Sequence, residues 1–132
     1  MKVKPVIIHR ILFVVYILAV FYLCFGHFEP NDDIPRNLIG IPADKVAHFL
    51  MFLPFVPLTY LSFYAGKGKM SSLVLFCAMM FGIGGIMAGG IEIVQGMTTY
   101  RSKDIFDFVA DGLGLCTGVL VTILYAHISH KI

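Results

Sequence analysis

Four long apolar stretches alternate with short polar segments along the 132-residue chain, at about residues 6–26, 46–64, 71–95 and 105–127. A helix needs about 20 apolar residues to cross the hydrocarbon core of a bilayer. Strands with open edges would leave backbone groups without hydrogen bonds in that environment. The pattern therefore predicts an all-α fold, a single-domain polytopic transmembrane four-helix bundle with short loops.

The composition supports a membrane protein. Hydrophobic residues make up 58% of the chain and charged residues 14%, whereas soluble domains average roughly 45–50% and about 25%. Disordered chains are poor in aromatic residues and rich in charge, so disorder is excluded as well. The net charge is only +2 and no basic stripe is present, so nucleic-acid binding is not expected.

The positive charges predict how the bundle is inserted, because Lys and Arg favour short cytoplasmic loops. With four spans, the two termini and the 65–70 loop share one side, which holds six positive charges and no acid. The opposite side holds four positive charges and all eight acids. We expect both termini to be cytoplasmic. Lys2, Lys4 and Arg10 before an apolar core also suit a signal peptide, but bulky residues around Cys24 favour an uncleaved helix.

Ionisable residues near the spans gather at one end of the predicted bundle, the extracytoplasmic end. Each costs about 2.5–3.5 kcal/mol at the centre of a membrane helix, so each needs a partner or a purpose. The second span opens with one group, the third closes with another, and the fourth is introduced by the last: Asp44, Lys45 and His48; Glu92 and Gln95; Arg101, Asp104, Asp107 and Asp111. They predict an acidic, histidine-containing pocket that opens outward.

Small residues and prolines indicate how that pocket is built. The third and fourth spans contain Gly85-x-x-x-Gly89 and Gly114-x-x-x-Gly118, a spacing that lets membrane helices approach closely. We expect close packing of these two spans, although five glycines in the third also suit a flexible helix. Prolines 54 and 57 predict a kink in the second span below the histidine.

The same clusters resemble the VanZ-like family of small membrane proteins. The run Asp44-Lys45-Val46-Ala47-His48-Phe49 is similar to the opening of that family's motif. Its continuation is similar to Glu92-Ile93-Val94-Gln95, Arg101-Ser102, Asp104, Asp107, Gly114 and Gly118, while Asp111 stands where the family more often has Asn. The resemblance covers roughly residues 40 to 120. It implies a bacterial cytoplasmic membrane and a role in the cell envelope or in resistance to the glycopeptide teicoplanin.

The first functional hypothesis is a membrane-embedded enzyme. A divalent cation could be held by carboxylates and imidazole, with candidate ligands Asp44, His48, Glu92, Asp107 and Asp111. Lys45 and Arg101 would then clamp the phosphate of a lipid-linked cell-wall precursor or another phosphorylated amphiphile. Without a metal, His48 oriented by Asp44 would act as a base and Glu92 as an acid. The expected catalytic residues are Glu92, His48 and Asp107.

Three further hypotheses remain open. A binding module would hold a glycopeptide or a lipid headgroup without turnover, using the expected binding residues Asp44, Lys45, Gln95, Arg101, Asp104 and Asp111. A structural module would use Lys45, Arg101 and His48 as an ion-pair staple between the helices. A proton- or ion-coupled transporter needs acids near the midplane, and the purely apolar inner halves of the spans disfavour it for a monomer.

Overall fold

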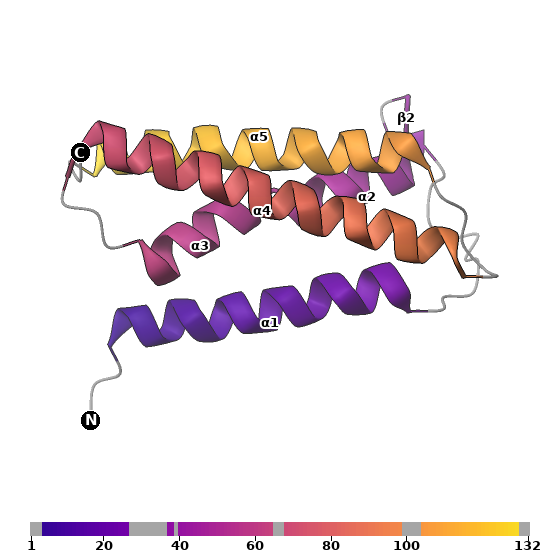
Figure 1. Ribbon diagram of the computed structural model, residues 1–132, viewed down its shortest axis with the longest axis horizontal. Helices are drawn as coiled ribbons and strands as arrows, with labels where there is room; N and C mark the ends of the chain where they lie inside the picture. Colours follow the sequence, from indigo (N-terminus) through magenta and orange to yellow (C-terminus); the bar gives the residue numbers. More distant parts are fainter. Residues whose placement is uncertain (1–3, 27–36, 39, 65–67, 99–103, 130–132) are drawn as a thin grey trace.

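The computed structural model describes residues 4–26, 37–38, 40–64, 68–98 and 104–129 (Figure 1). Its helices are α1 (Pro5–Phe25), α2 (Ala43–Phe52), α3 (Phe55–Phe63), α4 (Met70–Gly96) and α5 (Ile105–Ile128). Two short strands, β1 (Asn37–Leu38) and β2 (Ile41–Pro42), pair antiparallel immediately before α2. The sequence did not predict this small ladder.

In the described part of the chain, four helical segments are long and apolar enough to cross a membrane: α1, the combined α2–α3 segment, α4 and α5. The predicted all-α fold is therefore confirmed, and the chain is a multi-pass membrane protein. The second span begins at Ala43 instead of Val46, so Asp44 and Lys45 belong to the first turn of a helix. Large apolar side chains such as Ile86, Leu120 and Leu18 are 64–78% exposed, as expected for a surface that contacts lipid.

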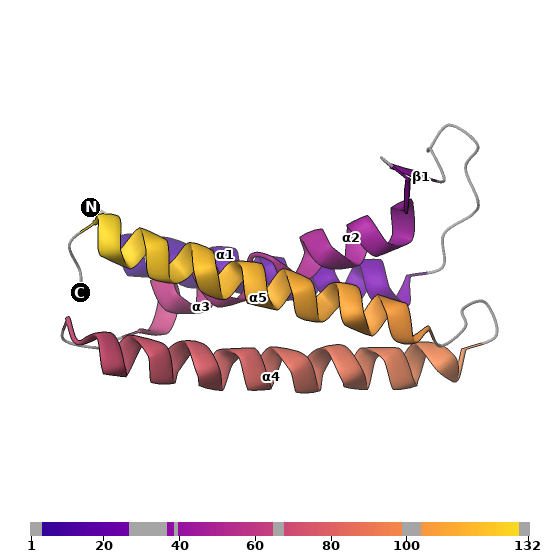
Figure 2. The same cartoon turned by 90° about the horizontal axis from the view of Figure 1, so that it is seen from above.

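Successive spans alternate in direction (Figure 1). Helices α1 and α4 run one way, whereas α2–α3 and α5 run the other, so α1 begins at the same end of the bundle where α5 finishes. The cytoplasmic location of that end stays a prediction. Helix α5 packs against both α2 and α4, and Figure 2 shows it between them. Parallel α2 and α5 therefore begin together at the end where α4 finishes.

The second span is broken where the prolines predicted a kink. Helix α2 ends at Phe52 and α3 starts at Phe55, with Leu53 and Pro54 between them. Proline has no backbone N–H, so a break of this kind leaves carbonyl groups without helical partners. One carbonyl at the break, that of Met51, accepts a hydrogen bond from the Tyr16 hydroxyl of α1. The break is thereby tied to the neighbouring helix.

The glycine spacing in α5 serves a different neighbour from the expected one. A Cβ atom on Gly114 would lie 2.4 Å from the Phe49 carbonyl oxygen, and one on Gly118 would lie 2.6 Å from that of Leu53. Gly114 therefore brings α5 against α2, and Gly118 brings it against the break that follows α2, not against α4. On α4, a Cβ on Gly85 would meet nothing within 4 Å. Helices α4 and α5 nevertheless pack against each other, as predicted. A Cβ on Gly84 would lie 2.6 Å from the Leu115 side chain of α5, and one on Gly89 would lie 3.6 Å from that of Phe108, so Gly89 is the member of the predicted pair that faces α5.

Helix α1 is anchored mainly on α3. The Arg10 Nε atom donates to the Ser62 carbonyl oxygen at 3.0 Å, and the guanidinium lies 5.5 Å from the centre of the Phe63 ring. At the opposite end of α1, Gln95 of α4 donates to the Cys24 carbonyl oxygen at 2.8 Å. These contacts fix α1 at both ends, and the hydrogen bond from Tyr16 to the Met51 carbonyl oxygen fixes its middle.

Candidate functional site

The polar residues meet where α2, α4 and α5 come together at one end of the bundle. Lys45 and His48 lie about one turn apart on α2. They face Asp104, Asp107 and Asp111, which follow each other along the start of α5. Because α2 and α5 run in the same direction, each basic side chain meets two successive acids.

The Lys45 ammonium is the centre of the outer half of the cluster. Its Nζ lies 2.6 Å from Asp44 Oδ2, Asp104 Oδ2 and Asp107 Oδ1. Asp104 also caps α5, since its Oδ1 accepts from the Phe106 N–H at 2.9 Å. The hydrogen bond from Lys45, followed by the one from the Phe106 N–H, holds the pKa of Asp104 below its ordinary value. All three donor positions of this ammonium are therefore occupied by carboxylates.

His48 is the centre of the inner half and is 5% exposed. Its Nδ1 lies 2.8 Å from Asp111 Oδ1, and its Nε2 lies 3.5 Å from Asp107 Oδ2. A carboxylate on one ring nitrogen orients the imidazole and sets which nitrogen carries the proton. Asp111 thus leaves Nε2 directed toward Asp107.

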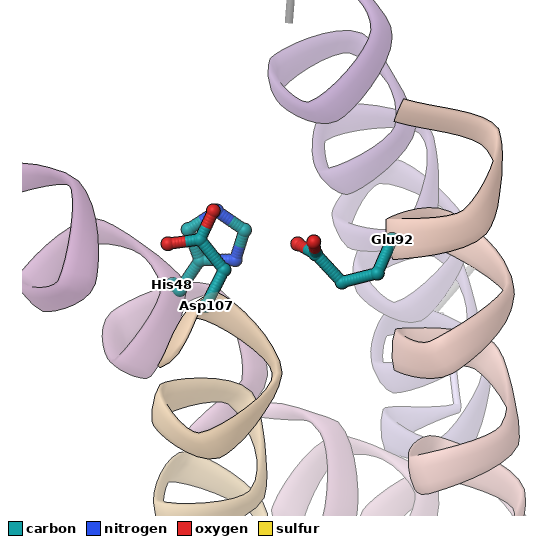
Figure 3. A group of neighbouring side chains, drawn as sticks. All are labelled: His48, Glu92 and Asp107. Atoms are coloured by element: carbon teal, nitrogen blue, oxygen red, sulfur yellow. The ribbon is translucent and has the colours of Figure 1, made fainter. Parts of the chain in front are cut away.

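Glu92 completes the inner half from α4 and is 3% exposed. Its Oε2 accepts from the Asp104 backbone N–H at 3.1 Å. Its Oε1 has no hydrogen-bond partner among the described residues, and the same holds for Asp111 Oδ2. Figure 3 shows the Glu92 carboxylate pointing from α4 toward His48 and Asp107. Beside one imidazole, two buried carboxylate oxygens therefore have no partner among the described side chains.

Two sets of residues place three ligand atoms within 4.8 Å of one another: Asp44, Asp104 and Asp107, and His48, Glu92 and Asp107. In the first set the Lys45 ammonium already occupies the position that a cation would take. In the second set no described side-chain cation does so. Metal–ligand bonds of about 2.0–2.2 Å place two ligands at most about 4.4 Å apart. The ligand atoms of the second set lie within 4.8 Å of one another, so they would have to move closer together to hold an ion.

The remaining candidate residues have other positions. The Gln95 side chain is 2% exposed and is used in its bond to α1, so it links helices instead of facing the pocket. Arg101 lies outside the described residues. Asp44 is the most exposed acid of the described cluster, with 58% of its side chain accessible. It faces Lys45, and the expectation that it orients His48 is wrong, because Asp111 contacts His48 Nδ1 instead.

Sequence reasoning missed the contribution of α1. A cavity of about 630 Å³ lies between α1 and α2, and its lining comprises Tyr16, Ala19, Val20, Leu23, Asp44, Ala47, His48, Leu50, Met51 and Pro54. The available signal was Tyr16, because a hydroxyl inside an apolar span needs a hydrogen-bond partner on a neighbouring helix. The cavity itself could not be predicted, because it depends on the break in the second span and on the packing of α1 against α3.

Comparison with known proteins gives one informative match. An uncharacterized protein of the fission yeast Schizosaccharomyces pombe is 31% identical over 112 residues, which make up 84% of this chain and 62% of the relative. The chain thus spans about three fifths of that protein's length. No family model matches the chain, and no solved structure gives a significant match.

The predicted membership of the VanZ-like family is wrong. No family model supports it, and the curated relative is a eukaryotic protein of unknown activity. The short motifs that carried the resemblance contain charged residues and glycines, several of which have local structural uses in this bundle. The bacterial membrane, the cell-wall precursor and the link to teicoplanin rested on that resemblance and lose their support with it.

Proposed function

We propose that this membrane protein binds a divalent cation through His48 Nε2, Glu92 and Asp107, and that the cation holds the phosphorylated headgroup of a membrane amphiphile. One observation carries the proposal. The buried Glu92 Oε1 has no partner among the described residues and points toward His48 and Asp107. A buried carboxylate oxygen without a donor is costly, and a cation would remove that cost.

The charge balance supports a cation. The described cluster contains five carboxylates, those of Asp44, Glu92, Asp104, Asp107 and Asp111. Among the described residues, only Lys45 and His48 oppose them. Even with a charged imidazole, three negative charges remain. Asp111 and Glu92 are almost fully buried, so water cannot stabilise them. A divalent ion would compensate two of the three charges.

The chemistry of the donors supports particular ions. Imidazole suits zinc and other transition metals, whereas carboxylates suit magnesium, calcium and manganese. One imidazole with two carboxylates therefore favours Zn²⁺ or Mn²⁺. Histidine ligands usually donate their other ring N–H to a carboxylate, which orients the ring and raises its basicity. Asp111 at 2.8 Å from His48 Nδ1 occupies that position.

An acidic pocket favours a phosphorylated ligand only when it holds a metal. Without the ion, the surplus carboxylates would repel a phosphate. With it, open coordination positions would accept phosphoryl oxygens and draw charge from them. The polar cluster lies at one end of three membrane-spanning segments, so its ligand would be an amphiphile. The charge pattern supports placing this end on the extracytoplasmic side.

An ion-pair staple is a second candidate, favoured by the three 2.6 Å contacts of Lys45. This function would explain the outer half of the cluster, where every carboxylate meets the ammonium. It does not account for the Glu92 and Asp111 oxygens that have no partner among the described residues. The two functions are compatible, since Lys45 would fix the helices around an ion bound deeper in the cluster.

Metal analysis of the purified full chain tests the proposal. The protein is loaded separately with Mn²⁺ and Zn²⁺, passed through a desalting column and assayed by mass spectrometry. We expect a stoichiometric ion in the wild type and its loss in Glu92→Gln and in His48→Gln. His127→Gln, which removes an exposed histidine at the far end of α5, is the matched control and should keep the ion.

The result that contradicts the proposal is a wild-type protein that stays metal-free after loading with both ions. The staple would then be the better function. If the ion is present, release of inorganic phosphate from an added phosphorylated amphiphile separates an enzyme from a binding protein. The variants that lose the ion should then lose that release as well.

A further inference from the structure

The cavity between α1 and α2 meets the proposed cation site at one end. Asp44 and His48 line it, and both belong to the polar cluster. Resting on the proposed function, we propose that this cavity holds the hydrocarbon chain of the amphiphile whose phosphorylated headgroup binds the cation.

The remaining walls of the cavity suit a hydrocarbon chain. Apart from the two cluster residues, its lining consists of apolar side chains and one tyrosine: Tyr16, Ala19, Val20, Leu23, Ala47, Leu50, Met51 and Pro54. The Tyr16 hydroxyl already donates to the Met51 carbonyl oxygen, so it requires no partner inside the cavity. The volume of about 630 Å³ lies within the range of roughly 300–1,000 Å³ that is typical of small-molecule sites.

The cavity is also accessible from the lipid. Leu23 on α1 is 46% exposed and Leu50 on α2 is 55% exposed, and both belong to the lining. Helix α1 packs chiefly on α3, and its hydrogen bond to the proline break lies at Tyr16. A chain can therefore enter sideways from the bilayer while its headgroup stays at the polar end.

A second cavity on the molecule shows why the polar end matters. It measures about 440 Å³ between α4 and α5, and its lining has no charged residue: Val74, Cys77, Ala78, Phe81, Cys116, Val119, Leu120 and Ile123. Such a groove would accept a lipid tail without selecting its headgroup. The α1–α2 cavity joins an apolar wall to an acidic, histidine-containing site, which is the combination that a metal-bound phosphorylated amphiphile requires.

The test uses hexadecyl phosphate as the probe and the Mn²⁺-loaded full chain in detergent. Ala19→Phe and Ala47→Phe each place a large side chain in the cavity from opposite helices, at positions that are exposed in the structure. Ala78→Phe makes the same change in the other groove and is the matched control. Native mass spectrometry measures the bound probe, and metal analysis is run on the same samples.

We expect each of the two cavity variants to bind hexadecyl phosphate at least tenfold more weakly than the wild type, with unchanged Mn²⁺ content. Ala78→Phe should bind like the wild type. Ethyl phosphate, which has almost no chain, should bind equally to all four proteins. Equal binding of hexadecyl phosphate to the wild type and to both folded cavity variants would overturn the inference, whatever the Mn²⁺ content. Absence of Mn²⁺ from the wild type would instead refute the proposed function.

Discussion

Replacing Gly114 with alanine tests how closely α2 and α5 must approach to assemble the polar cluster. The added Cβ would lie 2.4 Å from the Phe49 carbonyl oxygen and 3.2 Å from the Leu53 nitrogen. The first distance is about 1 Å shorter than an ordinary contact. Both neighbours are backbone atoms, so the strain cannot be relieved by rotating a side chain. Overpacking of this kind costs about 1–3 kcal/mol, and we expect the free energy of unfolding to fall by that amount.

The same displacement should also open the site. Moving α2 by about 1 Å lengthens the 2.8 Å contact between His48 and Asp111. Changes in the groups that orient a metal ligand typically weaken metal binding about 10–100-fold, and we expect Mn²⁺ binding to weaken to that extent. Denaturant-induced unfolding in detergent micelles measures the stability, and titration with Mn²⁺ measures the affinity.

Gly112→Ala is the control for this prediction. A Cβ at Gly112 meets nothing within 4 Å, and alanine favours a helix over glycine by up to about 1 kcal/mol. This variant should therefore be as stable as the wild type or slightly more stable. Equal losses of stability in the two variants would refute the close approach of α2 and α5 as the reason for glycine at position 114.

Three further predictions follow from individual contacts. Asp111→Asn keeps an acceptor for His48 Nδ1 but removes a buried charge, so Mn²⁺ affinity should fall about 10–100-fold while the free energy of unfolding stays equal or rises; a parallel loss of both would count against this. Lys45→Met leaves three carboxylates without their ammonium and should lower the free energy of unfolding by about 1–3 kcal/mol, measured by denaturant-induced unfolding. An unchanged free energy of unfolding would contradict the ion-pair staple in the outer half. Lys45 lowers the pKa of Asp104, so the contribution of their ion pair is complete above about pH 4 and is lost as the pH falls through the folded-state pKa. The difference in melting temperature between the wild type and Asp104→Asn should therefore narrow below about pH 4, and a difference that stays constant would contradict the pairing.

The spans and the polar end of the bundle could be predicted because they depend on local features. A run of about 20 apolar residues suffices to identify a membrane helix, and charges at the ends of successive helices must meet when those helices alternate in direction. Asp44, Lys45, His48, Glu92 and Asp107 were brought to one end by this reasoning alone, and the structure places them there. The break at Pro54 follows from the missing N–H of proline in the same local way.

The partners within the cluster could not be predicted, because they depend on how the helices rotate about their axes. Glycine spacing in two helices shows that close approaches occur, but it does not say which pair of helices approaches. The α5 glycines face Phe49 and Leu53 of the second span, so α2 supplies the two basic side chains that meet the α5 acids. The sequence also predicts Gln95 in the pocket, but the rotation of α4 about its axis directs the Gln95 side chain toward α1.

The division of the cluster into two halves is the feature with the clearest functional consequence. Lys45 satisfies the outer carboxylates, whereas the inner half retains two buried oxygens without partners among the described residues. Asp107 belongs to both halves, since Oδ1 meets Lys45 and Oδ2 faces His48. An ion bound in the inner half would therefore also change the ion pairs that join α2 to α5.

Pulsed electron paramagnetic resonance of the Mn²⁺-loaded protein is the most direct test of the cation site. It detects ligand nitrogen through its coupling to the unpaired electrons of the ion. We expect coupling to one imidazole nitrogen in the wild type and in His127→Gln, and its disappearance in His48→Gln. A spectrum from the wild type that shows only oxygen ligands, or a nitrogen coupling that persists in His48→Gln, would contradict a cation bound by His48, Glu92 and Asp107.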